Sequence, residues 1–249
     1  MSGRVILAEK KTKLIYVEDG KRFKLFDNSY KKPEIFNEAL NQVRAEQIGF
    51  NVPKVLDVTS IDGKWTIVSE FVDGEPLDSI IKKNPDKIGE YLNNFIELQL
   101  EIHKHKASAL VVMREKVQYK ITQADIPATT KCDLIIRLAK LPKKNNVCHG
   151  DFQPSNIVVT KDGTYYMTDW SHITQGNVYS DVAKTYLLLG LNMSEELAEE
   201  YLSLYCEKGQ ADKNEVLKWM PIVAAALLAK SREDERAYLL RWVNAEEIE

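Results

Sequence analysis

His-Gly-Asp-Phe-Gln-Pro-Ser-Asn-Ile-Val-Val, residues 149–159, is the stretch from which the rest of this sequence can be interpreted. It places a histidine, an aspartate and an asparagine within eight positions and then continues into a β-branched run. Pro154 and Asn156 disfavour a regular helix or strand across the polar part. The sequence therefore predicts a loop that leads directly into a strand at 157–160.

A hairpin is predicted immediately after this loop. The triplet 161–163, Lys-Asp-Gly, is a turn signal, and a second strand at 164–168 follows it. The hairpin would then carry Asp151 before its entry, Asn156 at its base and Asp169 at its exit.

These three oxygen-bearing side chains suit phosphoryl transfer. That reaction needs a carboxylate to orient the attacking hydroxyl and accept its proton, and oxygen ligands that hold Mg²⁺ against the nucleotide phosphates. We predict that Asp151 is the catalytic carboxylate and that Asn156 and Asp169 are metal ligands. The alternative is a buried, hydrogen-bonded histidine beside turn-forming residues, which the hairpin spacing of Asn156 and Asp169 disfavours.

The pattern resembles a known superfamily. His-x-Asp-x-x-x-x-Asn, followed by strand, turn, strand and Asp, is similar to protein-kinase-like enzymes. The fuller form, His-Gly-Asp-Phe-x-Pro-x-Asn with a later Asp-Trp, resembles the aminoglycoside phosphotransferase and choline kinase family, and the resemblance extends to about Gly190. It implies an α+β, two-lobed protein-kinase-like fold. Residues 1–72 would form a small antiparallel-sheet, nucleotide-binding N-terminal lobe, and residues 73–249 a larger, mainly helical catalytic and acceptor-binding lobe.

The N-terminal region shows the expected succession of short strands and one helix. Strands are predicted at 4–8, 13–17, 22–26, 54–58 and 65–71, and a helix begins near Pro33. The connection at 9–12 contains no glycine, so the Gly-rich phosphate loop of protein kinases is absent from this position. Lysines and backbone amides there could still approach phosphate, and an exposed basic turn is an equal alternative.

Lys24 is the candidate phosphate-binding lysine. Its side chain lies on the face of its strand opposite its apolar neighbours. The resemblance implies that Lys24 engages the nucleotide phosphates and that a carboxylate on the following helix positions it. Glu38 is the implied partner, and Glu34 and Glu46 are the competing candidates. A solvated strand lysine is the alternative for Lys24 taken alone.

The resemblance also implies an adenine site at the end of the strand 65–71. There the carbonyl of Glu70 and the amide of Val72 would bind the base through main-chain groups, so that the side chains are free to vary. A plain strand end is the alternative.

The rest of the sequence is predicted to be mainly helical. Helices are expected at 77–83, 86–106, 131–141, 194–206, 212–229 and 230–243, and from Asp181 as N-cap, while 107–130 gives no clear pattern. The resemblance implies that Gly176 and Asp181 brace the catalytic loop. Asp181 follows Asp169 by 12 residues. This leaves no room for the activation segment of a protein kinase and favours a small-molecule acceptor.

Composition excludes several classes of partner. The chain is 44% hydrophobic and 29% charged with a net charge of −3, which gives no reason to expect nucleic acid or an anionic membrane. The three cysteines show no pairing pattern and are typical of reduced thiols in a cytoplasmic protein. The apolar run at 222–229 is too short to cross a membrane. Nothing in the sequence indicates the oligomeric state.

The basic and acidic residues are unevenly divided between the two expected lobes. Residues 1–72 carry 12 Lys and Arg against 10 Asp and Glu, whereas the remainder carries 22 against 27. The acidic excess, which includes Glu233, Asp234 and Glu235, lies in the lobe expected to bind the acceptor. It favours a cationic acceptor such as an aminoglycoside or amino alcohol. A solvated helical surface is the alternative.

Two functional hypotheses follow. The first is a phosphotransferase that uses ATP or GTP with Mg²⁺ to phosphorylate a hydroxyl of an aminoglycoside-, amino alcohol- or sugar-like molecule. The second is a non-catalytic nucleotide-binding regulatory module, which the glycine-free connection at 9–12 keeps open.

Overall fold

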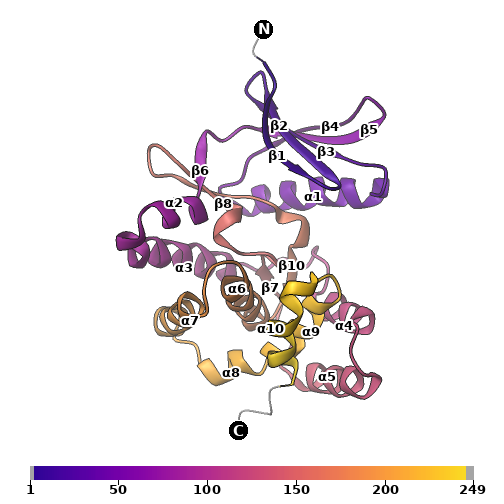
Figure 1. Cartoon of the computed structure of the whole chain (residues 1–249), viewed down its shortest axis with the longest axis vertical. Coiled ribbons are helices and arrows are strands. Elements are labelled where there is room, and N and C mark those ends of the chain that lie inside the picture. Colours follow the sequence, from indigo (N-terminus) through magenta and orange to yellow (C-terminus); the bar gives the residue numbers. More distant parts are fainter. Residues whose placement is uncertain (1–2, 245–249) are drawn as a thin grey trace. The chain divides into compact units, whose positions relative to one another are not determined.

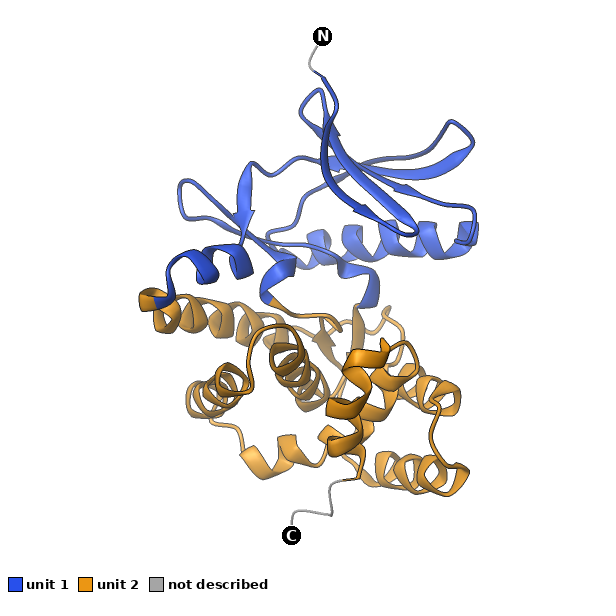
Figure 2. Cartoon of the chain, viewed as in Figure 1, with its two compact units in different colours: residues 1–85, 154–172 blue, residues 86–153, 173–249 orange. Residues whose placement is uncertain are grey.

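The computed structural model describes residues 3–244; residues 1–2 and 245–249, which belong to the two expected lobes by sequence, lie outside the described residues. The chain forms two compact units, residues 1–85 with 154–172 and residues 86–153 with 173–249 (Figure 2). The antiparallel sheet lies in the first unit, and the second unit is mainly helical. This division differs from the expected boundary after residue 72, because the predicted hairpin packs with the first unit.

The first unit is built on a five-stranded antiparallel sheet with strand order β1-β2-β3-β5-β4 (Figure 1). Its strands are β1 Val5–Lys10, β2 Lys13–Glu18, β3 Lys21–Phe26, β4 Val55–Ile61 and β5 Lys64–Glu70. Lys24 lies in the central strand β3, opposite Ile15 of β2 and Ile67 of β5. This position explains why Lys24 is buried, with only 5% of its surface exposed.

Helix α1, Lys32–Ile48, packs against β4 and β5. Pro33 lies in its first turn, where its missing N–H costs nothing, and Gly49 ends it with a left-handed φ of 103°. Phe26, Ile35 and Ile67 form a small apolar core between the helix and the sheet. This core fixes the side of α1 that faces Lys24.

The predicted hairpin is present in the first unit. Strand β6, Gly74–Pro76, pairs with β8, Ile157–Thr160, which pairs with β9, Tyr165–Met167. Helix α2, Leu77–Lys83, and the 3₁₀ turns Pro154–Asn156 and Trp170–His172 complete the unit. The Met167 amide donates to the Asn51 carbonyl at 2.8 Å, and the Trp170 ring stacks on Phe50 with centroids 5.2 Å apart. These contacts attach the hairpin to the end of α1.

The elements of the second unit are α3 Ile88–Lys104, α4 Met113–Gln123, α5 Ala128–Lys140, β7 Asn146–Cys148, β10 Thr174–Gly176, α6 Val178–Asn192, α7 Glu195–Gly209, α8 Lys213–Leu217, α9 Met220–Leu228 and α10 Glu233–Val243. The 3₁₀ turn Pro85–Lys87 lies at the boundary between the two units in the sequence. In the second unit, α6 packs against α7, α8, α9 and α10, while α4 and α5 pack against α9 and α3 packs against α7. Within the described residues, no helix is long and apolar enough to cross a membrane.

Two predictions about helix ends are wrong. The expected helix at 212–229 is two helices, α8 and α9, because Pro221 cannot continue a preceding helix and instead lies in the first turn of α9. The N-cap of α6 is Asn177, whose side chain accepts from the Tyr179 amide at 3.0 Å. Asp181 lies in the first turn, which releases its carboxylate for other contacts.

Candidate active site

The predicted metal ligands of the first unit lie at the open end of the hairpin. The Asn156 carbonyl accepts from the Thr168 amide at 2.8 Å and from the Thr168 hydroxyl at 3.0 Å. These bonds hold the start of β8 beside the residue that precedes Asp169. The backbone of Asp169 is left-handed, with φ 59°, a conformation that aspartate tolerates better than most residues. The fold thus brings Asn156 and Asp169 to the same end of one hairpin.

Asp169 is held as a carboxylate by its surroundings. The Lys24 ammonium lies 3.4 Å from its Oδ1, and the Ser171 hydroxyl donates to the same oxygen at 2.9 Å. Burial acts to raise the pKa of Asp169. The charges of Lys24 and Lys13 outweigh it and hold the pKa of Asp169 well below its ordinary value. Asp169 therefore offers ionised oxygen ligands at neutral pH.

The carboxylate that pairs with Lys24 is Glu38. The Lys24 ammonium and Glu38 Oε1 are in contact, and Lys13 lies 3.6 Å from the other oxygen of Glu38. Lys24 and Glu38 are both buried. The competing candidate Glu34 instead accepts from the Lys31 amide at 2.8 Å at the start of α1. The lysine, its helix partner and Asp169 thus form one connected network.

The expected adenine-binding segment lies directly after the sheet. Glu70 is the last residue of β5, and its amide donates to the Lys54 carbonyl at 2.9 Å. Val72 is half-buried in the connection between β5 and β6. At the other end of the sheet, β1 continues to Lys10, so that the glycine-free connection shortens to a two-residue turn.

The second unit contains the Asp151 loop, which carries the predicted catalytic carboxylate. Gly150 has a left-handed φ of 77°, which explains the glycine at this position. The Asp151 side chain is 21% exposed; Lys184 lies 3.4 Å from its Oδ1, and the side-chain Nε2 of Gln153 donates to its Oδ2 at 3.3 Å. The Asp151 amide lies 3.2 Å from His149 Nδ1. Both carboxylate oxygens of Asp151 are therefore oriented by neighbouring side chains.

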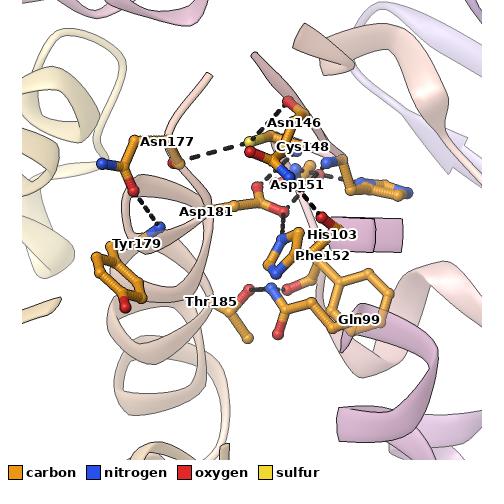
Figure 3. A network of polar contacts seen from close by, with 12 residues as sticks. Gln99, His103, Asn146, Cys148, Asp151, Phe152, Asn177, Tyr179, Asp181 and Thr185 are labelled. Carbon is orange, nitrogen blue, oxygen red and sulfur yellow. Dashed lines mark hydrogen bonds and ion pairs between the residues drawn. The ribbon is translucent and has the colours of Figure 1, made fainter. Parts of the chain in front are cut away.

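Asp181 braces this loop, as predicted (Figure 3). Its two oxygens accept from the amides of His149 at 3.1 Å and Gly150 at 2.8 Å, and His103 Nε2 lies 3.2 Å away. Burial acts to raise the pKa of Asp181, but the hydrogen bond and charge of His103 lower it overall. A buried anion thus anchors the backbone on either side of the loop glycine.

The other half of the predicted brace, Gly176, has a packing reason. Gly176 ends β10 opposite Asn146 of β7, and a Cβ added there would lie 2.6 Å from the Cβ of Met113. No side chain larger than hydrogen fits between β10 and α4. Gly176 therefore allows α4 to approach the strand that precedes α6.

Sequence reasoning missed Lys184, which contacts the predicted catalytic carboxylate. A signal was present, because Lys184 follows Asp181 by three residues on α6 and such residues share a helix face. If Asp181 faces the loop, then Lys184 faces it as well. The sequence also gave no indication that His103, near the end of α3, contacts the Asp181 carboxylate.

A metal ion at the hairpin would need ligands beyond the protein. Among the described residues, no three His, Cys, Asp or Glu side chains gather as a metal site. Magnesium commonly takes one or two protein oxygens and fills its remaining positions with water and substrate phosphates. The oxygens of Asn156 and Asp169 fit that type of ligand set.

The comparisons with known proteins agree with this geometry. The model of the Phosphotransferase enzyme family (APH) matches residues 16–219. A thermostable mutant of aminoglycoside phosphotransferase APH(4)-Ia, in a ternary complex with ADP and hygromycin B, is similar with a TM-score of 0.73 at 13% identity over 97% of this chain and 92% of that chain. Among the curated proteins, none matches the sequence.

Two further solved structures are similar over nearly the whole chain. Aminoglycoside-3'-phosphotransferase of type VIII has a TM-score of 0.67 at 15% identity and covers 94% of this chain and 93% of its own. A choline/ethanolamine kinase family protein from Mesorhizobium loti has a TM-score of 0.65 at 13% identity and covers 99% and 90%. These similarities confirm the predicted protein-kinase-like α+β fold.

Proposed function

The chain belongs to the phosphotransferase enzyme family, and from this premise we propose that it transfers the γ-phosphate of ATP to a hydroxyl group of a small molecule. The observation that carries the proposal is the Lys24–Glu38–Asp169 network, which combines a buried, oriented ammonium with a carboxylate kept ionised. Such a network suits a metal-bound triphosphate.

Residues 1–72 form the nucleotide-binding lobe in this proposal. Lys24, positioned by Glu38, contacts the phosphates. The carbonyl of Glu70 and the amide of Val72 bind the adenine of ATP, and main-chain recognition of this kind leaves GTP as a second nucleotide to test. The support is the burial of Lys24 and Glu38 and the position of Glu70 at the end of β5.

Magnesium belongs to the same proposal. Asn156 and Asp169 would hold it through their side-chain oxygens, and the ion would neutralise charge on the transferred phosphoryl group. The support is that both residues lie at one end of the hairpin and that Asp169 has a lowered pKa.

Asp151 is the catalytic residue of the second lobe, residues 73–249. Its carboxylate orients the acceptor hydroxyl and receives its proton as the phosphoryl group is transferred. Lys184 and Gln153 hold the two carboxylate oxygens, and Asp181 holds the loop backbone.

The three cysteines, all free thiols, support a cytoplasmic location.

A small acceptor is supported by the segment between Asp169 and Asp181. It contains only the short 3₁₀ turn Trp170–His172, the strand β10 and the start of α6. A protein kinase docks its peptide substrate on a longer segment at this place. One similar structure contains hygromycin B, an aminoglycoside, which is consistent with an acceptor of that size.

The test is a transfer assay with Mg-ATP and a panel of aminoglycosides, amino alcohols, sugars and hydroxy acids. Mass spectrometry of the acceptors detects the product, and Asp151→Ala is the negative control. We expect a phosphorylated acceptor with the wild type and none with the variant. ATP binding without transfer to any acceptor would contradict the proposal and favour the non-catalytic regulatory module.

A further inference from the structure

Four lysines of the second unit interact with one another, and three of them, Lys116, Lys120 and Lys184, also interact with the predicted catalytic carboxylate Asp151. Lys116 and Lys120 lie on α4, Lys184 lies on α6, and Lys230 follows the end of α9. Both α4 and α6 pack against α9. The charges of Lys184 and Lys230 act on Lys116 and Lys120, and so does the charge of Asp151. We refer to these four residues as the lysine cluster.

The placement of the lysine cluster is built into the helices. Lys116 and Lys120 are four residues apart, so they share one face of α4, and both are half-buried. The side chain of Lys184 is 14% exposed; it donates to the Gly150 carbonyl and lies 3.4 Å from Asp151 Oδ1. Lys230 is exposed, whereas Lys116, Lys120 and Lys184 are partly shielded from solvent.

The electrostatics show an excess of positive charge. Burial is the largest effect, and with the charges of Lys184 and Lys230 it lowers the pKa of Lys116 to about 8 and that of Lys120 to about 7. Asp151 acts in the opposite direction on both lysines without offsetting these effects. An anion placed among the four ammonium groups would be stabilised, because it favours their charged forms.

We propose that the lysine cluster binds an anionic group, a carboxylate or a phosphate, of the acceptor molecule whose hydroxyl is phosphorylated beside Asp151. This inference rests on the proposed function and names the substrate class. It differs from the expectation of a cationic acceptor, which came from the acidic excess of residues 73–249. Exposed charges such as Glu233 and Asp234 are screened by salt over about 8–10 Å, whereas the half-buried lysines beside Asp151 are screened much less.

The nucleotide is the competing source of the same anionic chemistry. A phosphate of ATP could occupy the cluster instead of the acceptor. Lysine variants distinguish the two sources. If the lysine cluster binds the acceptor, the variants weaken acceptor binding; if it binds ATP, they weaken nucleotide binding.

The experiment uses the full chain and matched pairs of hydroxyl compounds: glycerate and glycerol, gluconate and sorbitol, ribose 5-phosphate and ribose. Lysines labelled by ¹³C reductive methylation report binding by NMR without any turnover. At least one anion is expected to shift the Lys116 and Lys120 signals and raise the pKa of Lys120, while its neutral partner leaves them unchanged. Lys120→Gln should weaken that anion roughly 10- to 100-fold, which is the range for a lost charge-assisted hydrogen bond.

Controls separate the possible outcomes. Lys120→Arg should restore anion binding, and Lys140→Gln, an exposed lysine on α5, should leave it unchanged. The inference is wrong if no anion binds better than its neutral partner, or if Lys120→Gln and Lys140→Gln have equal effects. It is also wrong if Lys120→Gln weakens ADP binding by the same factor. Failure of transfer to every acceptor, with anion binding intact, would instead overturn the proposed function.

Discussion

The surroundings of Asp169 and Asp151 differ in charge balance. Around Asp169 the positive groups meet matching carboxylates, because Lys24 contacts both Glu38 and Asp169 and Lys13 lies near Glu38. Around Asp151 the lysine cluster exceeds the negative charge that opposes it. The difference teaches that the first region is organised by ion pairs within the protein, whereas the second retains positive charge that a ligand can neutralise.

The largest expected effect concerns Asp151. Asp151→Asn removes the proton acceptor while keeping the size of the side chain, so kcat should fall roughly 10²- to 10⁴-fold. Steady-state kinetics with any acceptor from the panel measures it. Asp133→Asn, an exposed carboxylate on α5, is the matched control and should leave kcat unchanged. An equal loss in both variants would remove the distinction between Asp151 and an ordinary surface carboxylate.

The second prediction tests the charge balance around Asp169. Glu38→Gln leaves buried Lys24 with Asp169 as its carboxylate partner, and we expect the free energy of unfolding to fall by about 3 kcal/mol. Glu46→Gln makes the same change two turns later on α1 and should cost less than about 0.5 kcal/mol. Urea denaturation measures both. Equal stability of the two variants would show that the Lys24–Glu38 pair contributes nothing to the network.

The third prediction concerns the brace beneath Asp151. Asp181→Asn keeps only one acceptor oxygen for the backbone amides of His149 and Gly150. The substitution should therefore lower the free energy of unfolding by about 2 kcal/mol at neutral pH. Because the folded protein lowers the pKa of Asp181, its stabilisation is present above the ordinary pKa near 4 and is lost as the pH falls through the lowered value. The difference between wild type and variant should therefore shrink below about pH 4. A constant difference from pH 7 to pH 3 would rule out this linkage.

The smallest expected effect is at the start of α6, the helix that carries Asp181 and Lys184. Asn177→Ala removes the N-cap bond to the Tyr179 amide and should cost about 1 kcal/mol of stability. Asn177→Asp keeps the acceptor of the cap but loses the bond that the Asn177 side-chain amide donates to the Pro142 carbonyl at 3.2 Å, so comparing the two variants separates the cap from that bond. Thermal denaturation of the three proteins is the measurement, and an unchanged midpoint in Asn177→Ala would contradict the cap.

Sequence predicted the part of the site that depends on local spacing. The hairpin that carries Asn156 and Asp169 follows from turn residues and β-branched runs, and Lys24 lies in its predicted strand. The Lys24–Glu38 contact was implied by resemblance, and the structure contains it. Spacing alone could not have chosen Glu38 over Glu34 or Glu46, because all three lie on α1.

Sequence could not predict the features that depend on helix packing. Lys116 and Lys120 fall in a region whose periodicity is weak, and their proximity to Lys184 depends on how α4 and α6 meet α9. The N-cap of α6 was misplaced because aspartate is as good a cap residue as asparagine, and only the packing shows that Asp181 holds the loop.

We propose that Asp169 binds the metal-bound nucleotide and that Asp151 orients the acceptor. The most direct measurement is the Kd of ADP with and without Mg²⁺ for the wild type, Asp169→Asn and Asp151→Asn. We expect Mg²⁺ to tighten ADP binding in the wild type and in Asp151→Asn, and to have no effect in Asp169→Asn. The reverse pattern, or the same magnesium effect in both variants, would contradict the claim.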